Sequence, residues 1–495
     1  MTSKVDVTKE IIFASSDPNV SRQISAMVKS GRLKKIAPRL YTSNLVDSFE
    51  SIVRRNIIDI LVWRYPGAII SHRSAQEMRP TPQGDFFLTA SYSKRVTDLP
   101  GITINLIKGP AADESDMPYN GIFIASEYRW VLENMQISRK TEHQSKTLPI
   151  AQIEDKLEKI LLLGGEDQLN AYRDHLRQVS VRLDMAQEFE KINKIISALL
   201  ATHSADVLST PSAKAMAAGM PFDKDRINLF EILFNAIKDE YFVYRANRNR
   251  DEESFRLFSF FESYFSNYIE GTEFEIDEAK QIVDSGIPIP RRDEDSHDIL
   301  GTFRILSNRV EMSRVPTSTD ELYSILQSRH SVLLSGRPHL NPGIFKTVNN
   351  RAGNTEFVDY HLVKGTLNYG YKFYSALKDP FARAIFMMFM ISEVHPFNDG
   401  NGRVSRIMMN AELVQADQTR IIVPTVFRED YLLALRKLSR QQDPGAYINV
   451  MVKLQKFSDN LYGSDFTELK EYLRQCNAYE EPSQAKLEII DRIIR

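Results

Sequence analysis

The spacing of apolar residues predicts that the C-terminal half of the chain is mainly α-helical. Residues 381–394 are almost continuously apolar, and a second helical pattern runs over residues 404–416. The longest apolar run near them, residues 384–391, is far shorter than the roughly 20 residues that a membrane-spanning helix needs. We therefore expect residues 381–394 to form the buried central helix of a helical domain, and we expect no association with a membrane.

Two further segments of this half have patterns of their own. Residues 254–271 combine helical spacing with many aromatic side chains, and Gly271 is suited to end that helix. Residues 341–358 instead predict two extended arms around a turn at residues 349–354, where a Gly-Asn pair favours a tight reversal. We expect a small β-hairpin at this place.

The N-terminal half mixes helical and extended patterns. Residues 19–30 carry apolar side chains at helical spacing until Gly31, and residues 121–125 have the composition of a short strand. Residues 151–203 form a highly charged helical stretch, whereas the glycines and prolines of residues 100–116 predict loops. The predicted fold class is mainly α, with an α/β region at the N-terminus.

Length and composition favour three domains. A chain of 495 residues exceeds the size at which single hydrophobic cores stop growing, and its apolar fraction of 42% is ordinary for a globular protein. We expect domains at residues 1–80, 81–203 (α/β and helical) and 225–495 (helical), with a linker at residues 204–221 that is rich in Ala, Ser and Pro.

Cysteine usage and the N-terminus indicate a cytoplasmic protein. The single cysteine, Cys476, excludes an intramolecular disulfide and agrees with a reducing compartment. Residues 1–10 lack the apolar segment of a signal peptide. The histidines between residues 297 and 361 show no metal-ligand spacing with cysteines or carboxylates, so we expect no zinc site.

The richest chemical motif is the run HPFNDGNGRVSR at residues 395–406, between the two C-terminal helical patterns. Its glycines allow successive backbone N–H groups to point into a concavity at the start of the second helix, where the helix dipole also attracts anions. Arg403 and Arg406 share roughly one face of that helix, and arginine grips phosphate oxygens bidentately. The run therefore predicts a binding site for a polyphosphate.

Three other residues of the run add to this chemistry. Asp399 offers a carboxylate oxygen, and Mg²⁺ in proteins usually takes one or two carboxylates together with phosphate oxygens and water. The side chain of His395 has a pKa range that suits a general base near neutral pH. Phe397 is expected to turn inward and anchor the loop. Each residue type is common on protein surfaces, but their joint occurrence indicates that a hydroxyl is deprotonated beside a magnesium-bound nucleotide.

This run resembles the signature of the Fic family, HPFx(D/E)GNGRxxR, without a gap or a departure at a defining position. The segments at residues 381–385, 422–431, 434–440 and 473–478 are also similar to bacterial members, so the resemblance covers roughly residues 225–495. It implies a helical Fic fold with a small hairpin flap. It also implies an enzyme that transfers AMP from ATP to a hydroxyl side chain of a target protein, or of itself.

The resemblance assigns a role to each matching residue. His395 deprotonates the target hydroxyl, Asp399 holds Mg²⁺, and the flap docks the target backbone by strand addition, with Phe357 either as an apolar contact or as a buried anchor. The residues expected at the nucleotide are Phe397, Gly400, Asn401, Gly402, Arg403 and Arg406. Gly400 favours nucleotidyl transfer over the γ-phosphate transfer of the related Doc kinases, and transfer of UMP or phosphocholine stays open.

A second motif of the family, (S/T)xxxE(G/N), is matched by the segment SNYIEG that ends at Gly271. The resemblance implies that Glu270 pairs with Arg406 and inhibits the enzyme, because a carboxylate and a triphosphate cannot both hold one arginine fork. Ser266, Glu270 and Gly271 are therefore expected to form an inhibitory segment. Whether Glu270 also positions a water molecule that removes AMP from the target stays open.

The N-terminal region carries local positive charge. Residues 21–41 lack acidic side chains, and their basic residues are Arg22, Lys29, Arg32, Lys34, Lys35 and Arg39. Residues 33–41 resemble the wing of a winged helix-turn-helix, and with residues 69–75 they are similar to the N-terminal region of AbiEi-type abortive-infection antitoxins. That resemblance implies DNA binding through residues 1–80. A protein-recognition role is an equal alternative, and the net charge of −2 confines any DNA-binding surface to a local patch.

Two classes of function follow from the sequence. The first is an autoinhibited Fic nucleotidyltransferase that uses ATP and Mg²⁺ to modify a Ser, Thr or Tyr hydroxyl. The second is a DNA-binding regulator, transcriptional or antitoxin-like, whose Fic core senses nucleotide. A homodimer is compatible with either class.

Overall fold

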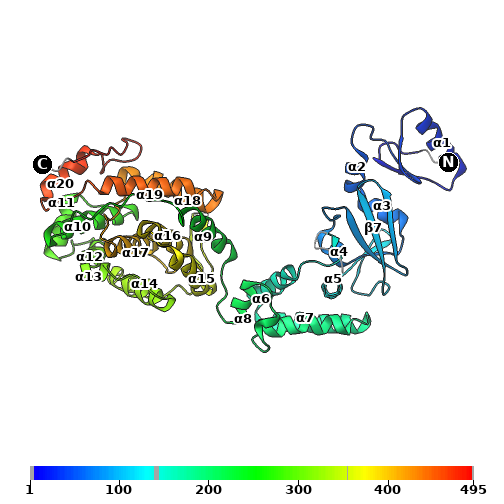
Figure 1. Ribbon diagram of the computed structural model, residues 1–495, viewed down its shortest axis with the longest axis horizontal. Coiled ribbons are helices and arrows are strands. Elements are labelled where there is room, and N and C mark those ends of the chain that lie inside the picture. Colours follow the sequence, from blue (N-terminus) through cyan, green and yellow to red (C-terminus); the bar gives the residue numbers. More distant parts are fainter. Residues whose placement is uncertain (1–4, 139–143, 354, 493–495) are drawn as a thin grey trace. The chain divides into compact units, whose positions relative to one another are not determined.

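The computed structural model describes residues 5–138, 144–353 and 355–492 of the chain (Figure 1). The chain folds as two compact units, Met1–Ala218 and Gly219–Arg495. The first unit combines helices with β-sheets, and the second is almost entirely helical. The predicted fold class is therefore confirmed. None of the helices within the described ranges combines the length and the apolarity that a membrane crossing requires.

The first unit begins with a small antiparallel sheet in the order β1-β3-β2. Its strands are β1 (Ile11–Phe13), β2 (Lys34–Ala37) and β3 (Leu40–Thr42). Helix α1 (Pro18–Lys29) is capped by the side chain of Asp17, which accepts the N–H of Asn19. The predicted helix is present, and β2 and β3 form a hairpin in the segment that resembles a wing. The element before α1 is a strand and not a second helix.

A second sheet has six strands in the order β6-β7-β5-β4-β9-β8. They are β4 (Ile69–Ile70), β5 (Asp85–Ala90), β6 (Lys94–Leu99), β7 (Ile102–Lys108), β8 (Met117–Tyr119) and β9 (Ile122–Ile124). Strand β9 confirms the short strand predicted there, but β7 shows that the loop prediction for residues 100–116 was wrong. Gly101 (φ 69°) lies in the tight turn between β6 and β7, so this glycine belongs to a β-hairpin and not to a long loop. Since β4 pairs with β5, residues on both sides of the boundary predicted at residue 80 share one sheet.

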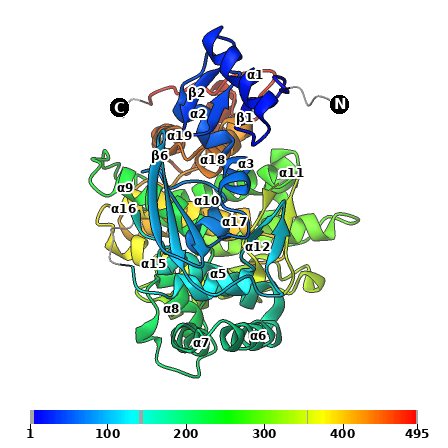
Figure 2. The same cartoon turned by 90° about the vertical axis from the view of Figure 1, so that its right-hand side faces the viewer.

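Helices complete the first unit. They are α2 (Phe49–Arg55), α3 (Ile57–Arg64), α4 (His72–Glu77), α5 (Glu127–Asn134), α6 (Ile150–Arg182), α7 (Ala186–Leu199) and α8 (Pro211–Ala217), with a 3₁₀ turn η2 (Ala205–Val207). Helices α6 and α7 confirm the charged helical stretch, and they lie side by side, seen end-on in Figure 2. The linker prediction for residues 204–221 needs correction, because α8 packs through the buried Ala213 into the core of this unit.

The second unit is a helical assembly around α16 (Figure 1). Its helices are α9 (Lys224–Ile237), α10 (Glu252–Ile269), α11 (Ile276–Ser285), α12 (Asp293–Leu306), α13 (Arg309–Met312), α14 (Thr319–Leu333), α15 (Val363–Ala376), α16 (Pro380–Val394), α17 (Asn401–Gln415), α18 (Arg428–Gln441), α19 (Pro444–Ser458) and α20 (Phe466–Gln475). Short 3₁₀ turns are η3 (Pro338–Leu340), η4 (Tyr360–Leu362) and η5 (Thr425–Phe427).

Helix α16 is the predicted buried centre of this unit. Asp379 caps it and Pro380 starts it, which fixes its first turn. Most of its side chains are fully buried, and it packs against α9, α15 and α17. The helix thereby holds His395, the residue that follows it, against a rigid core.

The predicted hairpin is also present in this unit. Strands β10 (Arg351–Ala352) and β11 (Thr355–Glu356) pair antiparallel, so that Ala352 lies opposite Thr355. Asn354, which belongs to the predicted turn, lies outside the described residues. We refer to residues 341–358 as the flap.

Candidate active site

The run at residues 395–406 connects α16 to α17 and reverses the chain between them. His395 follows α16 with a left-handed backbone conformation (φ 52°), and Gly400 precedes α17 with another (φ 72°). Glycine adopts positive φ without steric cost, whereas a histidine in this region needs support from its surroundings. The reversal places the N-terminus of α17 and the side chain of His395 in the wall of one cavity.

That cavity has a volume of about 830 Å³. The site residues predicted from the sequence that line it are Glu270, His395, Asp399, Asn401, Gly402 and Arg406. Its other lining residues come from the flap and from helices α9, α16 and α18. The predicted residues that lie outside its lining are Ser266, Gly271, Phe397, Gly400 and Arg403. The cavity thus gathers a histidine, a carboxylate, a glycine at a helix N-terminus and a buried arginine.

Phe397 anchors the loop, as predicted, because its side chain is fully buried in the core. Its backbone N–H donates to Oδ1 of Asn401 over 2.8 Å, and its carbonyl accepts from Nδ2 of Asn401 over 2.8 Å. The same carbonyl also accepts from Nδ2 of Asn350, in the flap, over 2.8 Å. Phe397 therefore fixes the loop from inside the core and does not itself face the cavity.

His395 is buried and held in one orientation. Its ring stacks on Phe357 of the flap, with centroids 3.5 Å apart and an angle of 5° between the planes. Nδ1 lies 3.2 Å from the carbonyl of Ser392, and since a carbonyl can only accept, Nδ1 carries the proton. Burial lowers the pKa of His395 to about 4. The ring is therefore neutral near pH 7, and its Nε2 is free to accept a proton.

Glu270 lies in the cavity against Arg406 and Gly402. Arg406 donates from Nη2 to Oε1 of Glu270 over 2.7 Å, and from Nε to Oγ of Ser266 over 3.0 Å. A Cβ atom placed on Gly402 would lie only 2.2 Å from Oε1 of Glu270, so the carboxylate sits directly over this glycine. A carboxylate therefore fills the place where the glycine and the arginine could otherwise hold a phosphate group.

Glu270 reaches this place because α10 ends there. The N–H of Gly271 (φ 91°) donates to the carbonyl of Tyr268, and the N–H of Thr272 donates to that of Asn267. These two bonds form a Schellman motif, with glycine in the left-handed position that it favours. The prediction that Gly271 terminates the helix is confirmed, and Ser266 and Glu270 lie in its last turn.

Arg403 does not belong to the cavity lining. Its Nη1 donates to Oδ2 of Asp298, on α12, over 2.7 Å, and lies 3.3 Å from Oδ1 of Asn267. Its Nη2 is 3.8 Å from Oδ2 of Asp399, at the edge of ion-pair distance. Asp298 has no signal in the sequence, because its partners Arg403 and Arg337 come from distant helical segments.

Two arginines hold the second arm of the flap, and neither is marked by a sequence motif. Arg226 of α9 donates to the carbonyl of Glu356 over 2.7 Å and pairs with the buried Glu393 over 3.1 Å. Arg440 of α18 donates to Oγ1 of Thr355 over 2.8 Å. The flap is therefore tied to the helices that form the cavity walls.

The comparison with protein families then identifies this region. Residues 321–413 match the Fic/DOC family. The match begins in α14, contains the whole of α15 and α16, and includes the run at residues 395–406.

Curated relatives of the Fic/DOC region are named adenylyltransferases. "Protein adenylyltransferase fic-1" of Caenorhabditis elegans is 26% identical over 180 residues, which are 35% of this chain and 35% of the relative. "Probable protein adenylyltransferase aq_aa38" of Aquifex aeolicus is 30% identical over 144 residues, which are 29% of this chain and 36% of the relative. The chain thus spans little more than a third of the length of these relatives.

Solved structures of Fic proteins are similar over longer stretches. Fic-1 (residues 134–508) from C. elegans covers 66% of this chain and 94% of its own, with 15% identity and a TM-score of 0.36. A Fic family protein from Desulfovibrio desulfuricans covers 51% of this chain and 75% of its own, with 16% identity and a TM-score of 0.35.

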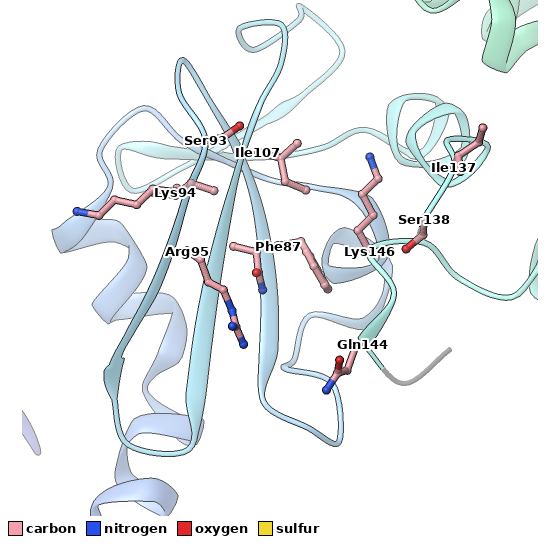
Figure 3. Close-up of a pocket in the computed structure, with 11 residues that line it drawn as sticks. Phe87, Ser93, Lys94, Arg95, Ile107, Ile137, Ser138, Gln144 and Lys146 are labelled. Carbon is pink, nitrogen blue, oxygen red and sulfur yellow. The ribbon is translucent and has the colours of Figure 1, made fainter. Parts of the chain in front are cut away.

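The first unit has a separate cavity of about 450 Å³ on its six-stranded sheet (Figure 3). Phe87, Arg95 and Ile107 contribute to it from three adjacent strands, while Lys94 points away from them. Lys146 reaches it from the segment before α6 and donates to Oε1 of Gln136 over 2.5 Å. Burial lowers the pKa of Lys146. Among the described residues, the cavity lining contains Lys94, Arg95 and Lys146 and no acidic side chain.

The basic side chains predicted to contact DNA lie at the start of this unit. All six are exposed, on α1 and on or beside the β2–β3 hairpin. None of the six forms an ion pair with a carboxylate in the part of the chain that the structure describes. They are Arg22, Lys29, Arg32, Lys34, Lys35 and Arg39.

Proposed function

We propose that the second unit is a protein adenylyltransferase, which transfers AMP from ATP to a Ser, Thr or Tyr hydroxyl of a target protein or of the chain itself and releases pyrophosphate. The observation that carries the proposal is the joint presence, in one cavity, of neutral His395 and of an anion site made by Gly402 and Arg406. The names of the curated relatives support the same reaction class. UMP or phosphocholine transfer remains the alternative within this class.

Each residue of the cavity has a distinct proposed role in this reaction. Nε2 of His395 takes the proton of the attacking hydroxyl, and the Ser392 carbonyl at Nδ1 keeps the ring in the required tautomer. The N–H groups at the start of α17 and the guanidinium of Arg406 hold phosphate oxygens. Catalysis of this kind rests on positioning and on electrostatic stabilisation of the charge that develops at phosphorus.

Asp399 is the residue proposed to hold Mg²⁺. Its side chain is 48% exposed, lines the cavity and offers the hard oxygen that this ion prefers. No group of three or more His, Cys, Asp or Glu side chains within the described ranges could hold a metal ion alone. One carboxylate with phosphate oxygens and water therefore fits the donor set. Bound Mg²⁺ would neutralise charge on the phosphate oxygens.

Glu270 is proposed to keep the enzyme inactive. Its carboxylate and the γ-phosphate of ATP compete for the same guanidinium and for the space over Gly402. A hydrogen bond between charged groups contributes about 1.5–3 kcal/mol, which corresponds to roughly a 10- to 150-fold change in the affected equilibrium. Glu270→Gly should therefore raise the initial rate of AMP transfer by about that factor.

Incubation of the protein with α-³²P-ATP and Mg²⁺ tests both AMP transfer and inhibition by Glu270, because self-modification labels the protein's own band on a denaturing gel. Glu270→Gly should incorporate more label than the unmodified chain, and His395→Ala in that background should incorporate none. Glu273→Gly removes an exposed carboxylate just beyond the same helix end and serves as the matched control. Absence of label from every variant, also with UTP and CDP-choline and with added protein extract, would contradict transferase activity.

DNA binding through residues 1–80 is the second candidate function. The observation that favours it is the set of six exposed basic side chains on α1 and around the β2–β3 hairpin, for which no carboxylate among the described residues forms an ion pair. Cations in such an arrangement can neutralise DNA phosphates. In this case the Fic region would act as a nucleotide sensor or as the enzymatic partner of a DNA-binding unit.

A further inference from the structure

His330 is a buried residue of α14 that none of the roles above uses. Its side chain is completely inaccessible to solvent, and its ring stacks flat on that of Phe397, with centroids 3.8 Å apart and planes 4° apart. Phe397 is the residue that anchors the loop of the run at residues 395–406. His330 therefore lies directly behind the loop, on the side away from the cavity.

Both ring nitrogens of His330 have defined partners. Nε2 lies 3.0 Å from the carbonyl of Asp399, and Nδ1 lies 2.8 Å from the backbone N of Gly343. A carbonyl only accepts and a backbone N–H only donates, so Nε2 carries the proton and Nδ1 carries the lone pair.

The partner at Nδ1 belongs to the beginning of the flap. Gln327, one turn earlier on α14, donates to the carbonyl of Gly343 over 3.0 Å, so α14 binds both polar groups of this glycine. The N–H of Lys346 donates to the carbonyl of Pro396 over 2.8 Å, and Nζ of Lys346 donates to Asn350 over 2.7 Å. The flap is thereby fastened to the loop at several points, and His330 links the two from α14, through Gly343 of the flap and Asp399 of the loop.

We infer that His330 is a positioning residue that sets the peptide of Asp399, and so the direction of its carboxylate, relative to the flap. Groups that orient a metal ligand from behind typically change metal affinity 10- to 100-fold when they are removed. By the same two bonds His330 links the part of the site that would hold Mg·ATP to the part that would hold the target. Because this role presupposes the proposed use of Asp399, the test includes a variant of Asp399 itself.

Three substitutions separate the contacts of His330. Phenylalanine keeps a flat ring against Phe397 and loses both hydrogen bonds. Asparagine places its oxygen near the position of Nδ1, so it can still accept from Gly343 but cannot reach Asp399. Glutamine places its amide nitrogen near the position of Nε2, so it can still donate to Asp399 and loses the acceptor for Gly343. All three are made in the Glu270→Gly background, in which the anion site is free.

The first readout is binding of a non-hydrolysable ATP analogue, measured by calorimetry with Mg²⁺ and with EDTA. We expect H330F and H330N to weaken the affinity measured with Mg²⁺ by about 10- to 100-fold. H330Q should stay within about threefold of the parent, and the affinity in EDTA should be equal in all four proteins. Equal weakening with Mg²⁺ and with EDTA would indicate general damage to the unit and would contradict a specific role.

The second readout is backbone hydrogen exchange without ligand. H330N should speed exchange in residues 396–400 and leave residues 341–346 unchanged, whereas H330Q should do the opposite. If Asp399→Ala abolishes the Mg²⁺-dependent affinity and H330F does not change it, the inference is wrong and the metal site stands. If Asp399→Ala has no effect, the proposed metal site is wrong, and the exchange pattern alone then decides whether His330 positions the loop.

Discussion

At the residue scale, burial determines the protonation state of His395, the proposed base. His395 is enclosed by the ring of Phe357 on one face, and its Nδ1 proton is directed at the Ser392 carbonyl. An imidazolium in this place would lose hydration without gaining a carboxylate partner at hydrogen-bond distance. The site therefore favours a base that is already neutral, at the cost of a lower affinity for the proton.

This protonation state predicts a flat pH profile near neutrality. His395 has its pKa lowered to about 4, so it stays neutral above that value and is protonated only as the pH falls through it. In the Glu270→Gly variant, kcat/KM for AMP transfer should show no decline attributable to this histidine between pH 8 and pH 5.5. An inflection of kcat/KM near pH 6.5 in the Glu270→Gly variant would contradict the buried, neutral histidine.

At the scale of elements, the loops of the site depend on helices that lie far away in the sequence. Arg226 belongs to α9 and yet holds the carbonyl of Glu356 in β11, which is 130 positions later in the chain. Its second partner, Glu393, is buried at the end of α16, and burial raises the pKa of that carboxyl group. One guanidinium therefore connects the flap to the helix that carries His395.

Replacing Arg226 should loosen the flap. In Arg226→Lys, an ammonium group can remain near Glu393 but cannot also hold the Glu356 carbonyl as the planar fork does. Loss of one such bond costs about 1 kcal/mol, so hydrogen exchange in residues 351–356 should accelerate about fivefold. Arg383→Lys is the matched control, since it alters an arginine that pairs with Glu412 outside the cavity lining. Equal exchange in the two variants would mean that Arg226 does not hold the flap.

The same scale separates what the sequence could predict from what it could not. The run at residues 395–406 is contiguous, so the helix ends, the reversal and the anchoring Phe397 followed from local chemistry. The pairing of Glu270 with Arg406 was accessible only through a family motif. The contacts of Asp298 with Arg403 and of His330 with Asp399 had no signal, because packing of whole helices decides which distant side chains meet.

The error in the first unit has a related cause. Strand β7 alternates buried and half-buried residues, which is the two-residue period of a strand. The prediction gave more weight to the glycines and prolines around it. In the structure those residues sit at the ends of β7, as hairpin and loop residues, and not within it. These glycines and prolines thus mark the two ends of β7, although the prediction took them as evidence that the whole segment is a loop.

At the scale of the whole molecule, the chain joins two units with different surfaces. Unit Gly219–Arg495 contains the Fic/DOC match, and unit Met1–Ala218 contains the exposed cations of α1 and the β2–β3 hairpin. The charges of the chain nearly cancel, with 63 basic and 65 acidic residues. Any attraction to DNA therefore has to come from this local patch and should depend strongly on salt.

For the first unit we predict how DNA binding depends on the salt concentration. The logarithm of the association constant for double-stranded DNA should fall linearly with the logarithm of the salt concentration, with a slope of about −0.9 for each phosphate contact. The double variant Lys34→Gln, Lys35→Gln should make the slope less negative by up to about 2, measured by fluorescence anisotropy. Lys94→Gln removes an exposed cation from the same unit outside residues 1–80 and should leave the slope unchanged. Binding that is absent, or equal in all three proteins, would contradict DNA recognition by this patch.

The ending of α10 has a consequence for how such an enzyme can be switched on. Residues 257–267 of α10 are buried in the core, whereas the side chain of Glu270, just before the glycine that closes the helix, is partly accessible. Helix ends open at a small fraction of the free energy that global unfolding requires. A protein or ligand that pulls on the residues after Gly271 need only unravel that last turn. The proposed inhibitory contact between Glu270 and Arg406 could thus be broken and re-formed many times while the rest of the unit stays folded.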